Sequence, residues 1–305
     1  MRSARPPRQL RRSRRPRLHH AARRSLARSL DALEAALRVV SDRPTGSQTI
    51  HHLRVAARRL LAQLTFMRGI VRKRPRRWLE RRLRGILRAT SAVRDLDILD
   101  LHMRRHAAVV TPHSCAPMRR AIADRRRAMD EVLRRVVWSL DMTRVSACRR
   151  RILERSSSSG NPSRRLERRL RRWIDRFLRS ARRPHAEHRP LHRLRMRCKR
   201  LRYVIGGLRD VLPGVAERSV SDLHRFQDRS GVCTDHWTAV ATARMMGNID
   251  TVATRRTAWR AVRRAERRAA DRVRRSLELW WDNAAGKRLR RHCRRCIRAI
   301  QGSRP

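Results

Sequence analysis

The chain has 305 residues, of which 81 are lysine or arginine and 25 are aspartate or glutamate, so its formal net charge is +56. Hydrophobic residues make up 40% of the sequence, which is enough for a folded core, and no apolar run is long enough for a transmembrane helix. We therefore expect a soluble protein with no membrane partner. A polyanion is the expected partner, because a bound polyanion relieves the repulsion within so charged a folded state.

The chain begins with a basic, proline-interrupted segment at residues 1–17, which we expect to be a disordered tail and not a secretory signal, because no apolar stretch follows its arginines. From about residue 20 onward, apolar residues recur every three to four positions, which predicts helices. The expected helices cover residues 20–41, 46–72, 76–109 and 117–154 and, after a polar break at 156–162, residues 164–182, 190–210, 214–246 and 250–283. Residues 286–305 are expected to form a basic C-terminal tail, which could include a helix at 286–300.

The two halves of the chain resemble each other in sequence. Residues 51–60 (His-His-Leu-Arg-Val-Ala-Ala-Arg-Arg-Leu) align with residues 192–201 (His-Arg-Leu-Arg-Met-Arg-Cys-Lys-Arg-Leu) at an offset of 141. Leu83 and Asp95 align with Leu223 and Asp235 at an offset of 140. Two matches at nearly the same offset indicate an internal duplication. The sequence thus predicts an all-α domain over residues 18–285, with one repeat at 18–155 and a second at 164–285.

Each aligned segment has a basic stripe when it is placed on a helix at 100° per residue. The stripe consists of His51, Arg54 and Arg58 in the first repeat and of His192, Arg195, Lys199 and Arg202 in the second. Many helices have a charged face that is merely solvated, but these stripes contain no acid and recur in both halves. Like charges one turn apart destabilise a helix unless a counterion is bound. The cations are spaced by about 5 Å along the helix axis and could follow a string of phosphates, which arginine binds bidentately.

The residues around both stripes resemble the two signatures of the CHAD family, the conserved-histidine α-helical domain. Residues 50–61 resemble the first signature, except that Leu61 replaces an arginine, and residues 192–203 match the second in full. Gly206 stands where a glutamate is usual, which puts one expected salt bridge in doubt. Residues 93–97 and 227–235 resemble two further family segments, with Ser230 in place of a leucine.

This resemblance covers about residues 20–283 and implies two pseudo-symmetric four-helix bundles with a basic groove or pore between them. It also implies binding of inorganic polyphosphate in the bacterial cytoplasm, at polyphosphate granules, with enzymes of polyphosphate metabolism as further partners. The polyphosphate-binding residues that it implies are His51, Arg54, Arg58, Arg59, His192, Arg195, Lys199, Arg200 and Arg202. The two histidines could donate hydrogen bonds to phosphate or pack between the bundles, and the sequence leaves both roles open.

Three aspartates and two cysteines could suggest metal sites. We expect Asp95, Asp97 and Asp235 to form structural salt bridges with nearby arginines instead of holding a divalent metal. Cys293 and Cys296 form a lone Cys-x-x-Cys pair, and a structural zinc site would need a second pair, so we expect both to face a helical bundle. The six cysteines are scattered along a long chain, which fits a reducing cytoplasm. We therefore expect no metal and no cofactor.

No motif predicts catalysis. The sequence lacks a Gly-x-x-x-x-Gly-Lys phosphate loop, a Glu-x-Glu-x-Lys triphosphatase signature and a Gly-x-Ser-x-Gly elbow, so we expect a protein that is not an enzyme. The alternative is a general nucleic-acid-binding protein, because any protein of charge +56 binds DNA or RNA at low salt. Against specific binding, Tyr203 is the only aromatic residue in either stripe, so platforms for base stacking are scarce.

Overall fold

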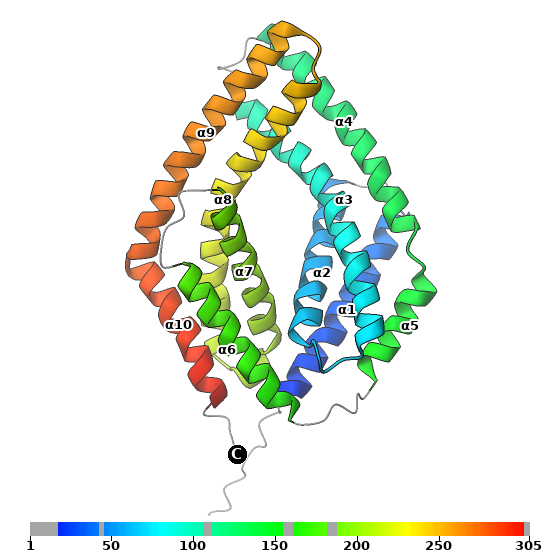
Figure 1. Ribbon diagram of the computed structural model, residues 1–305, viewed down its shortest axis with the longest axis vertical. Coiled ribbons are helices and arrows are strands. Elements are labelled where there is room, and N and C mark those ends of the chain that lie inside the picture. The colour runs from blue at the N-terminus through cyan, green and yellow to red at the C-terminus, as the bar shows by residue number, and fades with distance from the viewer. Residues whose placement is uncertain (1–17, 43–45, 106–111, 155–160, 182–187, 302–305) are drawn as a thin grey trace, which may run out of the picture.

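The computed structural model describes residues 18–42, 46–105, 112–154, 161–181 and 188–301 (Figure 1). The tail expected at residues 1–17 lies outside these ranges. Within them the regular secondary structure is helical, which confirms the all-α prediction. The helices are α1 (Leu18–Asp42), α2 (Ser47–Phe66), α3 (Lys73–Arg105), α4 (Pro112–Trp138), α5 (Met142–Leu153), α6 (Pro162–Ser180), α7 (His188–Gly207), the 3₁₀ turn η1 (Arg209–Val211), α8 (Val215–Ile249), α9 (Ala253–Asp282) and α10 (Ala284–Gln301).

The helix predicted over residues 117–154 is interrupted. The first part of this range belongs to α4, which ends at Trp138, and a second helix, α5, begins at Met142. The side chain of Asp141 accepts a hydrogen bond from the backbone N–H of Arg144 at 2.9 Å and caps the start of α5. The first backbone N–H groups of a helix have no partner within the helix, and such a cap supplies one. A single aspartate therefore favours the start of a new helix at this point.

The order and spacing of the helices repeat along the chain. α2 and α7 each contain 20 residues and begin 141 residues apart (188 minus 47). α4 and α9 also begin 141 residues apart (253 minus 112), and α5 and α10 begin 142 apart (284 minus 142). The offset found between the aligned sequences is thus also the offset between helices. Figure 1 shows α1 to α5 on one side of the molecule and α6 to α10 on the other.

The C-terminal segment differs from the expected basic tail. Residues 284–301 form α10, which packs against α6, α8 and α9. Leu289, Cys293 and Cys296 have no exposed surface, and together with Ile300 they form one apolar face of the helix. The domain boundary expected at residue 285 is therefore wrong, although the helix considered for residues 286–300 is formed and Cys293 and Cys296 face the bundle as expected.

Two hydrophobic clusters join the halves of the chain. The larger cluster includes residues of α1, α2, α6 and α7, and the ring of Phe66 in α2 lies 5.8 Å from that of Trp173 in α6. The smaller cluster lies where α3 and α4 meet α8 and α9, and includes Leu99, Met103 and Trp259. None of the described helices has a stretch that is both long and apolar enough to cross a lipid bilayer.

Candidate functional site

The apolar faces of α2 and α7 fix the direction of the two basic stripes. In α2, Leu53, Ala57, Leu60 and Leu64 have no exposed surface. In α7, the corresponding face consists of Leu194, Cys198, Leu201 and Ile205, each at most 5% exposed. Because side chains three and four positions apart share one face of a helix, burying these residues turns the cations of each stripe away from the core.

The two stripes meet at the centre of the molecule. The Nη1 atom of Arg58 in α2 lies 3.9 Å from the Sδ atom of Met196 in α7. Burial lowers the pKa of Arg58, and the charge of Arg195 across the junction lowers it further. Burial and then the neighbouring charges, including Arg195, lower the pKa of Arg54 to about 10. We call Arg54, Arg58, Arg195 and Lys199 the central cation cluster.

Lys199 is the most strongly perturbed member of this cluster. Burial lowers its pKa to about 6, together with the charges of Arg195, Arg58 and Arg54. Its amine is therefore mostly uncharged at neutral pH when no anion is present. A bound anion would raise this pKa again, because an opposite charge nearby favours the protonated form.

Two aspartates lie beside the cluster without forming ion pairs. Burial raises the pKa of Asp95 on α3 to about 6, and the charge of Asp235 on α8 acts in the same direction. In the described residues, neither aspartate has an ion pair within 4.0 Å, so the structural pairing expected of these two is not formed. Asp97 does form one, with Arg126 of α4 at 2.7 Å. Among the described residues, the guanidinium groups of the central cation cluster thus have no acid in direct ion-pair contact.

The neighbouring helices support the two stripes differently. Arg54 donates hydrogen bonds from Nη1 to the hydroxyl groups of Thr90 and Ser91 on α3, each at 3.1 Å. The Nε atom of Arg195 is buried and has no hydrogen-bond partner in the part of the chain that the structure describes. A Cβ atom at Gly231 of α8 would lie 3.0 Å from Nη2 of Arg195. Glycine at this position therefore leaves room for the guanidinium.

The remaining predicted cations lie around this centre. Arg59 and Arg202 both lie over the ring of Tyr203, with Cζ at 5.9 and 4.8 Å from its centroid, and Arg202 also donates a hydrogen bond to Oε1 of Gln227 at 3.0 Å. Arg200 is exposed.

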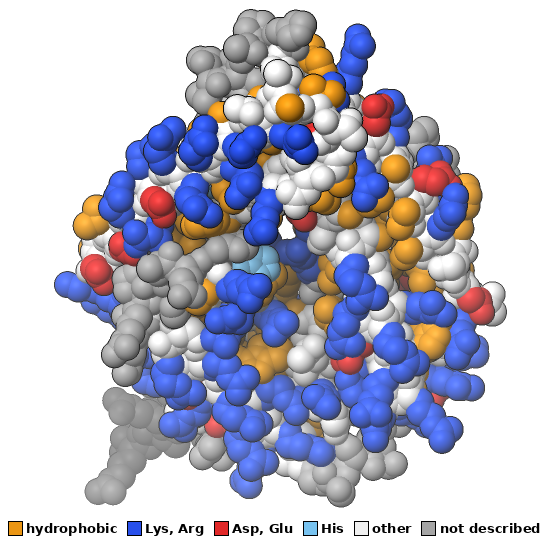
Figure 2. All heavy atoms as spheres, turned by 45° about the horizontal axis from the view of Figure 1, so that its top comes forward, with side chains coloured by type: hydrophobic (Ala, Val, Ile, Leu, Met, Phe, Trp, Pro, Cys, Tyr) orange, Lys and Arg blue, Asp and Glu red, His pale blue; other side chains and the backbone are white. Residues whose placement is uncertain are grey.

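The two predicted histidines are exposed, which disfavours a role as buried packing residues between bundles. Burial lowers the pKa of His51, and Arg94, Arg54 and Lys199 are among the charges that lower it further. His51 therefore lies close enough to the central cation cluster to contact the same ligand. Figure 2 shows lysine and arginine side chains gathered around a hollow near the centre of one face, with a histidine at its edge.

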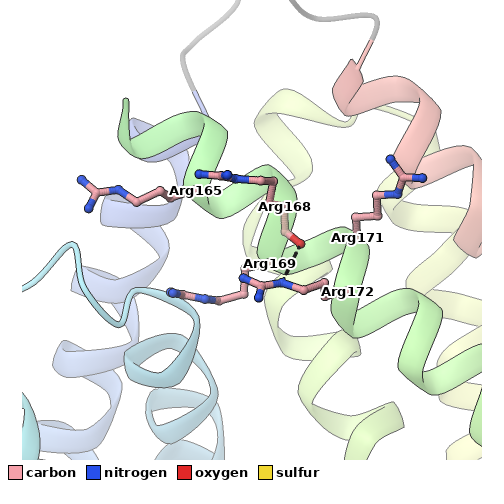
Figure 3. A pocket seen from close by; sticks show the side chains of 5 residues that line it. All are labelled: Arg165, Arg168, Arg169, Arg171 and Arg172. Carbon is pink, nitrogen blue, oxygen red and sulfur yellow. Dashed lines mark hydrogen bonds between the residues drawn. The ribbon is translucent and has the colours of Figure 1, made fainter. Parts of the chain in front are cut away.

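A second basic surface, on α6, was not predicted. Five arginines line an open cavity of about 480 Å³, namely Arg165, Arg168, Arg169, Arg171 and Arg172 (Figure 3). Arg169 donates hydrogen bonds to the backbone carbonyls of Phe66 and Arg68 at 2.5 and 2.6 Å, and so caps the end of α2. Figure 3 shows Arg165 and Arg171 pointing in opposite directions. These side chains therefore do not converge on one ligand position as the central cation cluster does.

A smaller cavity of about 350 Å³ lies on the second repeat. It is lined by Arg189, Trp237, Val240, Ala241, Arg244, Arg263 and Arg267. Trp237 is the aromatic residue that sequence reasoning missed, since it lies outside both stripes. Its place among arginines gives the nucleic-acid alternative its best candidate surface, because bases stack on aromatic and guanidinium planes.

Comparison with known proteins adds the following. The family profile of the CHAD domain matches residues 24–244, which include both stripes. Similar solved structures include PptA from Streptomyces chartreusis, which is 14% identical with a TM-score of 0.64 and aligns over 88% of this chain and 100% of its own. The CHAD domain from the plant Ricinus communis is 16% identical, has a TM-score of 0.65 and aligns over 92% and 93% of the two chains. At these identities the structural likeness concerns the fold alone. No curated protein sequence matches the chain.

Proposed function

We propose, from the premise that this chain belongs to the CHAD domain family, that it binds inorganic polyphosphate and catalyses no reaction on it. The observation that carries the proposal is the central cation cluster. Arg54, Arg58, Arg195 and Lys199 converge from two helices, and among the described residues none of them has an ion pair within 4.0 Å. The guanidinium charges repel one another, and an anion bound between them would relieve this repulsion and favour the charged form of Lys199.

Polyphosphate fits this arrangement because it is a flexible linear chain of negative charges. Cations one helical turn apart on α2 and α7 would contact successive phosphates from two sides, with arginine forks donating charge-assisted hydrogen bonds. In this proposal the two repeats form pseudo-symmetric bundles of five helices each, not the four expected from the sequence, and the polymer lies in the basic groove or pore between them. The repeated helix spacing supports that architecture.

Lys199 adds a dependence on pH to this binding. Because its pKa is about 6 in the free protein, the amine must take up a proton when it pairs with phosphate at neutral pH. The release of counterions from the polymer would supply much of the affinity, as it does when proteins bind the phosphate backbone of nucleic acids.

The cellular role follows from the same proposal. We expect the protein in the bacterial cytoplasm, at polyphosphate granules, with enzymes of polyphosphate metabolism among its partners. Nucleic acid would bind through bulk charge at low salt. If specific nucleic-acid binding were the true function, the cavity beside Trp237 would be its site, and Trp237→Ala would weaken DNA binding and leave polyphosphate binding unchanged.

The proposal is tested by reversing the same number of charges at two places. Arg195→Glu with Lys199→Glu changes the central cation cluster, and Arg168→Glu with Arg172→Glu makes a matched change on the exposed face of α6. We expect the first pair to weaken binding of long-chain polyphosphate by roughly 100-fold at physiological ionic strength, because each charge-assisted hydrogen bond contributes about 1.5–3 kcal/mol. The second pair should cost less than about fivefold. Circular dichroism checks that both variants remain helical, and equal losses would contradict a specific site.

A further inference from the structure

Three side chains that are far apart in the sequence meet in a buried cluster, each from a different helix. His102 of α3 and Glu266 of α9 are 4% and 0% exposed, and His236 of α8 is partly buried. The Nδ1 atoms of His102 and His236 lie 2.8 and 2.6 Å from the same carboxylate oxygen, Oε2 of Glu266. The two imidazole centroids are 4.8 Å apart. We call these three residues the His–His–Glu cluster.

The cluster lies at the contact between the two repeats. α3 belongs to the first repeat, whereas α8 and α9 belong to the second. Its neighbours along these helices, Leu99, Met103, Ala239 and Val262, are members of the smaller hydrophobic cluster. The polar groups are therefore surrounded by apolar residues, where a carboxylate and two imidazoles are costly to bury.

Buried carboxylates in this chain have arginine or histidine beside them. Glu80 pairs with Arg76 at 2.5 Å, and Asp250 pairs with Arg255 at 3.0 Å. Glu266 accepts hydrogen bonds from the Nδ1 atoms of His102 and His236. Histidine is the residue that can offer a neutral nitrogen lone pair, which arginine cannot.

Hydrogen bonds hold the carboxylate of Glu266 between the two imidazoles. Burial by itself raises the pKa of Glu266, but the hydrogen bonds from His102 and His236 outweigh burial and lower it to about 2. One potential ligand atom from each of the three residues lies within 4.8 Å of the others.

We propose that His102, His236 and Glu266 bind one divalent transition-metal ion such as Zn²⁺. Two imidazole nitrogens and one carboxylate oxygen are a common ligand set for this ion, with a fourth position left for water. Ligand distances of about 2.0–2.1 Å in a tetrahedral site place ligand atoms roughly 3.3 Å apart. To reach this spacing, the two Nδ1–Oε2 distances need to increase by about 0.5 and 0.7 Å, and the metal must displace the Nδ1 protons that now form the hydrogen bonds to Glu266. The ion would tie α3 of the first repeat to α8 and α9 of the second.

Binding of Co²⁺ and Zn²⁺ to the full chain, after treatment with a chelator, tests this site. Co²⁺ gives visible absorption bands that distinguish nitrogen and oxygen ligands from thiolates. We expect one Co²⁺ per chain with a spectrum free of thiolate charge transfer. We also expect Zn²⁺ at about 100 times its dissociation constant to raise the Tm by roughly 5 °C. Glu266→Gln and His102→Gln should each abolish the spectrum and the rise in Tm.

Two control variants remove the competing metal-binding groups. Cys293→Ser with Cys296→Ser removes the thiols of α10, and His224→Ala removes the exposed His224–Asp228 pair, whose Nδ1 and Oδ2 atoms are 2.5 Å apart. Both variants should bind Co²⁺ as the unmodified chain does. The proposal is overturned if the unmodified chain binds no Co²⁺, if a control variant loses the spectrum, or if Glu266→Gln keeps it.

A measurement on the unmodified protein keeps the test decisive if a variant fails to fold. X-ray absorption of the Zn²⁺-loaded full chain should show only nitrogen and oxygen ligands, with the scattering pattern of two imidazoles. Sulfur ligands, or fewer than two imidazoles, would contradict the assignment.

Discussion

Arg54 and Arg195 occupy equivalent positions in the two repeats, but their surroundings differ. At the offset of 140 that relates Asp95 to Asp235, Ser91 of the first repeat corresponds to Gly231 of the second. The hydroxyl of Ser91 accepts a hydrogen bond from Arg54, whereas Gly231 offers Arg195 space and no partner. The arginine is thus present in both repeats, but the hydroxyl group that accepts its hydrogen bond is present only in the first.

This difference suggests how the two repeats divide the binding free energy. Arg54 already donates hydrogen bonds to hydroxyl groups of the protein. Exchanging these bonds for bonds to phosphate therefore contributes less to the binding free energy. The buried Nε of Arg195 has no partner until a ligand arrives, and an unsatisfied buried donor costs about 1–3 kcal/mol. The binding free energy of a ligand that supplies this missing hydrogen bond should therefore depend most on Arg195.

The largest expected effect compares these two arginines directly. Arg195→Gln should weaken binding of long-chain polyphosphate by about 30-fold, and Arg54→Gln by about fivefold, because only Arg195 gains a first partner on binding. Equilibrium titration of both variants at physiological ionic strength measures the two losses. Equal losses, or a larger loss for Arg54→Gln, would contradict this division between the repeats.

A smaller effect concerns pH, because the equivalent of Arg58 in the second repeat is Lys199. With a pKa of about 6 in the free protein and a higher pKa beside phosphate, Lys199 takes up a proton on binding. Polyphosphate affinity should therefore rise by about tenfold in total as the pH falls from 8 to 6, which is within the limit of tenfold per pH unit that one proton allows. The charged groups that act on Lys199 are Arg195, Arg58, Arg54 and Asp235.

Two substitutions separate the titrating groups in this pH profile. Lys199→Arg keeps the positive charge at every pH and should flatten most of the dependence. Asp95, whose pKa is also about 6, becomes neutral over the same range and acts in the same direction, so Asp95→Asn should remove the remainder. A Lys199→Arg profile as steep as that of the unmodified protein would rule out Lys199 as the titrating group.

The smallest effect is expected when Gly231, the neighbour of Arg195, is replaced by the serine that lies beside Arg54 in the first repeat. Gly231→Ser would give Arg195 a hydroxyl neighbour like the one Arg54 has, at the cost of a Cβ placed 3.0 Å from Nη2. We expect polyphosphate affinity to fall by about two- to threefold, since part of the relief on binding is lost. Gly231→Ala adds the Cβ without the hydroxyl and serves as the matched control. If Ser and Ala have the same effect, crowding and not hydrogen bonding decides the behaviour of Arg195.

The helices could be predicted well wherever apolar spacing alone defines them. The expected helix at 214–246 is α8 (Val215–Ile249), and that at 250–283 is α9 (Ala253–Asp282). Prediction was wrong where a local or compositional signal opposed the periodicity. Asp141 starts a new helix within a continuous apolar pattern, and the many arginines of α10 favour a tail outside the domain although its apolar face is buried in the core.

Sequence reasoning identified the members of the central cation cluster but not their neighbours. Periodicity and the repeat placed Arg54, Arg58, Arg195 and Lys199 on two stripes, because these signals lie within single helices. The hydroxyls beside Arg54 and the role of Gly231 depend on how α3 and α8 pack against the stripes. The His–His–Glu cluster joins three helices, and no pattern within one helix could predict that they meet there.

The central claim is that the facing stripes form a site selective for polyphosphate. The most direct test measures binding of the full chain to long-chain polyphosphate and to duplex DNA at equal phosphate concentration, over a salt series that includes physiological ionic strength. We expect polyphosphate binding to persist at salt concentrations where DNA binding has vanished. If both affinities fall along one salt line, the chain binds polyanions through its net charge alone, and the selective site is contradicted.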